Sequence, residues 1–178
     1  MQSRSAITTI LAGQMPTPRL GCKRAPSARY WYQRGVDAEQ DGDIAHARYC
    51  YHRAVAQRPA FADAHNQLGR LAHELAQLAT TTVADRQAQL AIAESHYRLA
   101  LCATPHDGIY WFNLGLVLEQ QGPWSLAIAA YESALACDPT FVEAHVQLAA
   151  LFQERSDAGD PDAARLAIRH LSAARRGN

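Results

Sequence analysis

The chain has 178 residues, of which 48% are hydrophobic and 19% are charged, and this composition predicts one soluble globular domain with a tail. No apolar stretch is long enough for a membrane span, because Gln, Thr or a charged residue interrupts each one within about ten residues. Seventeen Lys and Arg balance seventeen Asp and Glu, so the chain lacks the basic excess that is typical of nucleic-acid-binding proteins.

Residues 1–27 differ in composition from the rest. Residues 1–29 carry a charge of +5 without any acidic residue, whereas residues 30–178 carry −5. Pro, Gly, Ser and Thr are scattered through residues 1–27 with no sustained period, which predicts a disordered basic tail. The tail is a poor secretory signal because threonines interrupt its short apolar run, and Arg19 stands where a lipoprotein signal before Cys22 needs Leu. We therefore expect a cytoplasmic protein; an envelope lipoprotein and an organelle-targeted protein are the alternatives.

An internal repeat follows the tail. Trp31 and Trp111 are each followed by Gly four and eleven residues later and by Pro 28 residues later. Between the second Gly and the Pro, both copies have Ala, Tyr and Ala at the same offsets: Ala47, Tyr51 and Ala54, and Ala127, Tyr131 and Ala134. Two weaker copies begin around His65 and His145, which replace the Trp.

This pattern resembles the tetratricopeptide repeat (TPR), a 34-residue helix–turn–helix unit with the signature W-x2-L-G-x2-Y…A-x3-F…P. The resemblance covers residues 28–178 and divides them into repeats at 28–61, 62–107, 108–141 and 142–178. It implies an all-α fold, an α-solenoid of stacked antiparallel helix pairs in a right-handed superhelix.

The repeated residues have definite packing roles. The glycines let paired helices approach closely where each Ala of the second helix meets them, and the tyrosine rings fill the space between hairpins. The prolines end the second helices. Asp43 and Asp160 are predicted to cap the second helices of the first and fourth repeats. In the fourth repeat the second helix is aligned on Ala164, Ile168 and Leu171.

Repeat two contains twelve additional residues around Leu78–Leu90. We expect both of its helices to be long and to protrude from the edge of the solenoid, with Asp85 capping the second.

The resemblance also implies a binding surface, because the first helix of each TPR lines the concave groove. Carrying the family positions over gives these groove residues: Tyr32, Gln33, Asn66, Gln67, Arg70, Phe112, Asn113, Leu116 and Gln147. Four of them are amides at the same place in successive repeats: Gln33, Gln67, Asn113 and Gln147. Since an amide both donates and accepts hydrogen bonds, this ladder is able to hold the backbone of an extended peptide; the alternative is a row of solvated polar residues. A carboxylate clamp for acidic peptide tails is not expected, because Arg70 is the only cation in the set.

No motif for catalysis or metal binding is present. The four cysteines form no C-x-x-C pair, and the eight histidines have no ligand spacing. His65 and His145 are interpreted as packing residues. The chain also lacks the nucleophile elbow, the P-loop and the dinucleotide-binding fingerprint. We expect neither an enzyme nor a bound cofactor or metal.

The sequence therefore predicts a non-catalytic adaptor or scaffold that binds a peptide segment of another protein. A secretion-system chaperone or a pilus- or envelope-assembly TPR protein is the alternative, and an enzyme on a helical solenoid is a third interpretation. The acidic repeats favour a basic partner, and the chain's own tail is the nearest one, so autoinhibition is a further interpretation. Ala163–Arg176 is predicted to serve either as a cap or as a homodimer interface.

Overall fold

The computed structural model describes residues 25–78, 82–122 and 124–177. These residues form eight α-helices and no strand, which confirms the predicted all-α fold. The helices are α1 (Ala28–Gln40), α2 (Ile44–Gln57), α3 (Ala62–Gln77), α4 (Val83–Ala103), α5 (Gly108–Gln121), α6 (Trp124–Cys137), α7 (Val142–Asp157) and α8 (Pro161–Gly177). Most of the predicted tail lies outside the described residues.

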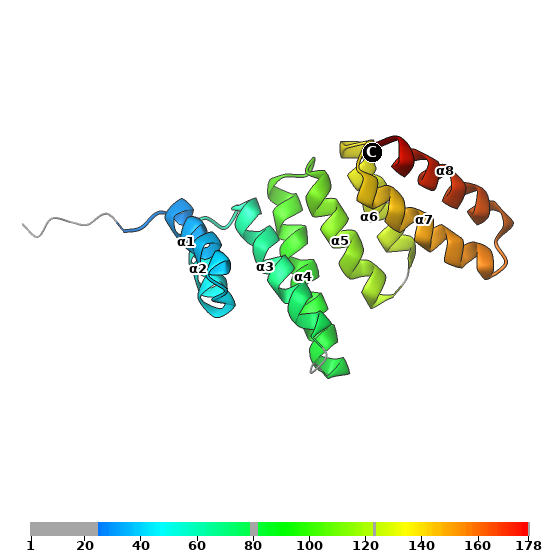
Figure 1. The fold of residues 1–178 in the computed structure, drawn as a ribbon. Coiled ribbons are helices and arrows are strands. Elements are labelled where there is room, and N and C mark those ends of the chain that lie inside the picture. Colours follow the sequence, from blue (N-terminus) through cyan, green and yellow to red (C-terminus); the bar gives the residue numbers. More distant parts are fainter. Residues whose placement is uncertain (1–24, 79–81, 123, 178) are drawn as a thin grey trace, which may run out of the picture.

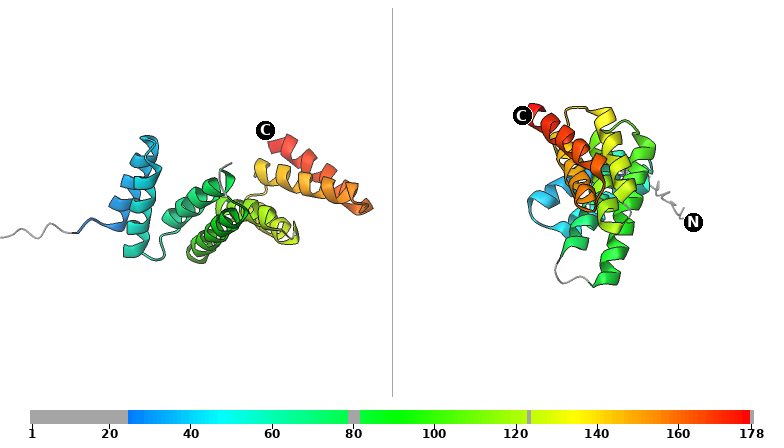
Figure 2. Two further views of the ribbon diagram at one scale, coloured as in Figure 1. Left: turned by 90° about the horizontal axis from the view of Figure 1, so that it is seen from below. Right: turned by 90° about the vertical axis from the view of Figure 1, so that its right-hand side faces the viewer.

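The helices pair into four hairpins, α1–α2, α3–α4, α5–α6 and α7–α8, each of which packs on the next. Figure 1 shows the hairpins in chain order along one direction, and Figure 2 shows that successive hairpins are rotated relative to one another. Because nearly all contacts join neighbouring helices, the molecule is a solenoid rather than a bundle around one centre.

Short-range signals place the helix ends. The α2, α4 and α6 helices each end two residues before a proline, as predicted. Asp43 caps α2 by accepting from the backbone N–H of His46 (2.9 Å), and Asp160 accepts from the N–H groups of Asp162 and Ala163 at the start of α8.

The cap of α4 was predicted wrongly. Thr82, and not Asp85, is the N-cap residue: its hydroxyl oxygen accepts from the N–H of Asp85 and its hydroxyl donates to the Asp85 carboxylate (2.6 Å). Both residue types are good caps, and the helix starts at the earlier one. With 21 residues, α4 takes most of the additional length, whereas α3, with 16 residues, is no longer than α7. The α3–α4 hairpin extends beyond its neighbours at its loop end (Figure 1).

Three fully buried tyrosines form the repeated core contact: Tyr51, Tyr97 and Tyr131. Each ring lies against the glycine of its own hairpin, where a Cβ atom would be 2.5 Å from Tyr51 Cε1 at Gly35 and 2.8 Å from Tyr97 Cε1 at Gly69. The residue that meets the glycine is therefore the tyrosine and not, as predicted, an alanine. Tyr51 also belongs to a buried cluster with Leu68 of the next hairpin, so its ring packs both within its own hairpin and against the next one.

In the fourth hairpin the predicted register of α8 is one residue off. The buried residues are Ala163 and Ala167, while Ile168 is 65% exposed and Leu171 is 46% exposed. The larger side chains point away from the core because no further hairpin covers α8 among the described residues. Only the alanine stripe that faces α7 is buried.

Candidate functional site

The predicted groove residues lie on the first helices of the four hairpins: α1, α3, α5 and α7. We call this set the first-helix face: Tyr32, Gln33, Asn66, Gln67, Arg70, Phe112, Asn113, Leu116 and Gln147. All are half-buried except Gln33, which is exposed. Hydrogen bonds and an ion pair between side chains connect α1 to α3 and α3 to α5, so these helices present one continuous surface.

The four amides of the predicted ladder differ in what they contact. Asn113 Nδ2 donates to Asn66 Oδ1 across the α3–α5 boundary (2.9 Å), and Gln67 Oε1 accepts from Arg70 Nε (2.9 Å). Gln33 Nε2 donates to Asp37 within α1 (3.0 Å). Equal sequence positions therefore do not give equal hydrogen-bonding capacity, because the neighbouring side chains differ.

Arg70 connects the first two hairpins. Its guanidinium contacts Glu39 of α1 (2.5 Å) and Glu74 of its own helix. About a third of the Arg70 side chain is solvent-exposed. Two carboxylates thus surround the one cation that the sequence placed on this surface, and one negative charge remains in excess.

Two further hydrogen bonds tie α3 to α5 at the ends of the first-helix face. The Tyr110 hydroxyl donates to Asp63 Oδ1 (2.6 Å), and Gln120 Nε2 lies 2.7 Å from His73 Nε2. His73 is buried, and burial lowers its pKa. The ring is therefore neutral near pH 7 and accepts the amide hydrogen of Gln120.

Sequence reasoning missed the polar residues at the far end of this surface. Glu39, His73 and Glu119 each stand four residues after the glycine of their repeat, so one helical turn places them on a common side. Glu119 Oε2 accepts from the hydroxyl of the buried Tyr131 (2.7 Å). Their constant offset from the glycine is the signal that identifies them.

The two aromatic residues of the first-helix face pack partly against rings of the core. The Tyr32 ring lies 5.6 Å from the ring of Tyr51 and 5.1 Å from that of Phe61. Phe112 repeats this arrangement with Tyr131 (5.6 Å) and Phe141 (5.0 Å). Each ring therefore offers only its outer part to a ligand.

At the Trp position of the second, third and fourth repeats, a ring nitrogen contacts a carbonyl oxygen at the preceding turn. Trp111 Nε1 donates to the Pro105 carbonyl (2.9 Å), and His65 Nε2 lies 2.8 Å from that of Pro59. His145 does the same with Pro139 (3.1 Å). The histidines thus replace both the packing and the hydrogen bond of Trp.

Each of these histidines also meets a second histidine from the partner helix of its hairpin. The Nδ1 atoms of His65 and His96 are 3.1 Å apart, and those of His145 and His170 are 2.9 Å apart. Since His65 Nε2–H faces a carbonyl, its Nδ1 accepts and His96 Nδ1–H donates. Burial lowers the pKa of His96 to about 4, so the His96 ring is neutral near pH 7.

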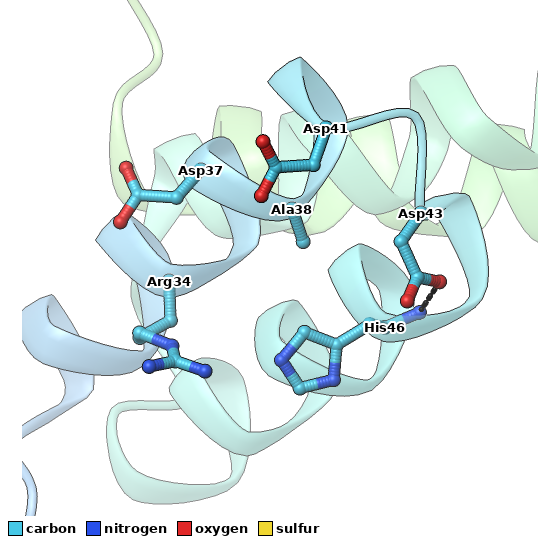
Figure 3. A pocket seen from close by; sticks show the side chains of 6 residues that line it. All are labelled: Arg34, Asp37, Ala38, Asp41, Asp43 and His46. Carbon is cyan, nitrogen blue, oxygen red and sulfur yellow. Dashed lines mark hydrogen bonds between the residues drawn. The ribbon is translucent and has the colours of Figure 1, made fainter.

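A cavity of about 400 Å³ opens between α1 and α2 (Figure 3). It is lined by Arg34, Asp37, Ala38, Asp41, Asp43 and His46. The Asp43 carboxylate accepts from the His46 backbone N–H as a helix cap. Within the described ranges, no three His, Cys, Asp or Glu residues are grouped to hold a metal ion, and no helix has the length and hydropathy to cross a membrane.

Comparisons with known proteins agree with this fold. The family model described as "Tetratricopeptide repeat" matches residues 81–140, and no curated protein matches the chain in sequence. Residues 41 to the end of MamA from Desulfovibrio magneticus RS-1 are similar with a TM-score of 0.67 and 19% identity, covering 85% of this chain and 78% of that chain. An ArsTM double mutant of MamA from RS-1 gives the same TM-score and identity over 86% and 76%.

The first TPR domain of Spaghetti (RPAP3), bound to the HSP90 peptide SRMEEVD, is similar with a TM-score of 0.62 and 18% identity. This match covers 73% of the present chain and 94% of the other. The sequence match and the shared fold agree with the repeated glycine, tyrosine and proline positions. The chain is a protein that contains tetratricopeptide repeats, arranged as an all-α solenoid.

Proposed function

We propose that this protein is a non-catalytic adaptor or scaffold that binds a peptide segment of a partner protein on the first-helix face. The observation that carries the proposal is the fixed geometry of this surface. Side chains of α1, α3 and α5 are held in register by direct contacts, Arg70 with Glu39 and Asn113 with Asn66. A preorganised surface loses little conformational entropy on binding, which favours recognition of an extended or helical segment.

The similar fold of the Spaghetti domain, whose structure contains a bound peptide, supports a peptide ligand for this surface. Repeat proteins of this type present surfaces rather than chemistry. The half-exposed amides and aromatic edges of the first-helix face suit a ligand that offers backbone hydrogen bonds and apolar side chains.

The test is affinity capture from the protein's own cells with the full-length chain and a variant of the first-helix face. The variant carries Gln33→Ala, Leu116→Ala and Gln147→Ala, which are exposed or half-buried positions. We expect recovery of the partner to fall at least tenfold, because three contacts of about 0.5–1 kcal/mol each are removed.

The matched control makes the same three changes on the second helices: Gln57→Ala, Gln89→Ala and Leu99→Ala. Leu99 is 44% exposed on α4 and contributes little to the core. The control should recover the partner as well as the wild type does. Equal recovery by all three proteins would contradict the proposal and would place binding elsewhere.

A further inference from the structure

The charges of the solenoid are divided between its two sets of helices. The first helices α1, α3, α5 and α7 contain four Arg and eight Asp or Glu, a net charge of −4. The second helices α2, α4, α6 and α8 contain eight Arg and four Asp or Glu, a net charge of +4. The overall balance therefore conceals an acidic set of first helices and a basic set of second helices.

On the first-helix side, the carboxylates are oriented but not neutralised. Asp63 and Glu119 each accept a hydrogen bond from a tyrosine hydroxyl, that of Tyr110 and that of Tyr131 respectively. A hydroxyl is an uncharged donor, so it fixes the carboxylate and leaves its charge. Both tyrosines are buried, which holds the two carboxylates in place.

The single cation of the first-helix face does not offset this charge. Arg70 is bound by both Glu39 and Glu74, and the three side chains together carry one negative charge. The helices α1, α3 and α5 thus each carry a carboxylate close to this surface, Glu39, Asp63 and Glu119. Arg34 of α1 instead lines the cavity between α1 and α2.

From this distribution we infer that the partner segment is basic. This inference rests on the proposed function and specifies its ligand: an extended stretch of a partner protein with Arg or Lys side chains interleaved with small apolar residues. Asp63 lies beside Tyr110 near the start of α5, whereas Glu119 stands nine residues after Tyr110, about 13 Å further along that helix. An extended chain advances about 3.3 Å per residue, so basic residues repeated along it reach carboxylates at both ends of the face, and the aromatic edges between them take the apolar residues.

The test uses the full-length chain and fluorescence anisotropy with labelled twelve-residue peptides. The basic probe has Arg at every third position with Ala and Leu elsewhere, and the acidic probe has Glu in place of each Arg. We expect the basic probe to bind at least tenfold more tightly than the acidic probe, and its affinity to fall with added salt.

The informative variant is Asp63→Asn with Glu119→Gln, since the amide oxygen still accepts the tyrosine hydroxyl. It should weaken the basic probe about tenfold, because two charge contacts are lost. Glu94→Gln with Glu132→Gln makes the same charge change on the second helices, where both residues lie outside the first-helix face, and should leave the affinity within about twofold. A basic probe weakened equally by both variants would overturn the inference, because it would report net charge alone.

Two other outcomes separate this inference from the proposed function. Tighter binding of the acidic probe, abolished by the Gln33, Leu116 and Gln147 substitutions, would overturn the basic ligand and keep the surface. The second outcome is that the basic probe binds only after its competitor in the chain is removed by Arg19→Gln, Lys23→Gln and Arg24→Gln. This would assign the surface to the chain's own amino-terminal segment and overturn a partner protein as its occupant. If neither the Gln33, Leu116 and Gln147 substitutions nor Asp63→Asn with Glu119→Gln weakened the binding of either probe, the result would contradict the proposed function itself.

Discussion

Replacing Gly115 by alanine is expected to destabilise the protein, although helix propensity alone predicts the opposite. In an exposed helix Gly→Ala stabilises by about 1 kcal/mol. Here the added Cβ would lie 2.6 Å from Cδ1 and 3.0 Å from Cζ of Tyr131, whereas carbon atoms prefer 3.5–4.0 Å. The ring is fully buried and its hydroxyl is bound to Glu119, so it has no free space to enter. Overpacking of this kind costs up to about 3 kcal/mol, which leaves a net loss of about 2 kcal/mol.

The measurement is thermal unfolding followed by circular dichroism, with urea unfolding as a second determination. A loss of about 2 kcal/mol should lower Tm by about 4–8 °C in a chain of this length. Gly35→Ala and Gly69→Ala should also destabilise, the latter least, because its Cβ would be 2.9 Å from Tyr97 Cδ1.

Two controls separate the clash from propensity. Ala150→Gly at an exposed position of α7 measures propensity without a ring nearby and should cost about 1 kcal/mol. Adding Tyr131→Leu to Gly115→Ala should make the pair of changes less costly than their sum, because the smaller side chain removes the clash. A Gly115→Ala protein as stable as the wild type would refute the packing argument.

Three further predictions concern stability. Burial lowers the pKa of His96 from 6.5 to about 4, so below pH 6.5 the unfolded chain binds a proton that the folded chain does not. The free energy of unfolding should be insensitive to this group above pH 6.5 and should fall by about 1–2 kcal/mol between pH 6.5 and pH 4. Urea titrations at several pH values measure this fall, which should be smaller in His96→Asn. Trp111→Phe should cost about 1 kcal/mol more than Trp31→Phe in urea unfolding, because Trp111 donates to the Pro105 carbonyl whereas Trp31 Nε1 has no hydrogen-bond partner among the described residues. A similar cost for both variants would argue against the contribution of that hydrogen bond. Asp43→Ala should cost about 1 kcal/mol by loss of the α2 cap, whereas Asp41→Ala in the same loop should cost almost nothing. The difference in thermal stability between the two variants measures the contribution of the cap.

Much of the fold follows from short-range sequence signals. A proline two residues beyond α2, α4 and α6 and an Asp before α2 and α8 define helix ends through local chemistry alone, and they were predicted correctly. The start of α4 was not, because both Thr and Asp are good cap residues, and here Asp85 supplies the backbone N–H and the carboxylate that bond to the Thr82 cap. The register of α8 was wrong for a different reason: a large apolar residue is normally a core residue, but in the part of the chain that the structure describes no further helix covers Ile168 and Leu171.

The candidate site shows a sharper limit. Sequence positions identify which residues share the first-helix face, since this depends on helical period only. They do not show which polar groups pair with each other, because pairing depends on contacts between residues such as Asn66 and Asn113, or Glu39 and Arg70, that belong to different repeats. The residues of the predicted ladder do lie on the first helices α1, α3, α5 and α7, but the carboxylates close to them were not identified from the sequence.

The same contact links the stability of the solenoid to the chemistry of its surface. Because Gly115 has no side chain, the Tyr131 ring of α6 packs directly against the α5 backbone, and its hydroxyl reaches Glu119 one turn further along α5. A change at the glycine thus acts on a carboxylate that the ligand is inferred to meet. Tyr131→Phe separates the two effects, because it keeps the ring against the glycine and removes only the hydrogen bond. It should leave packing nearly intact while freeing Glu119 to move, so that binding of a basic peptide weakens more than the fold does.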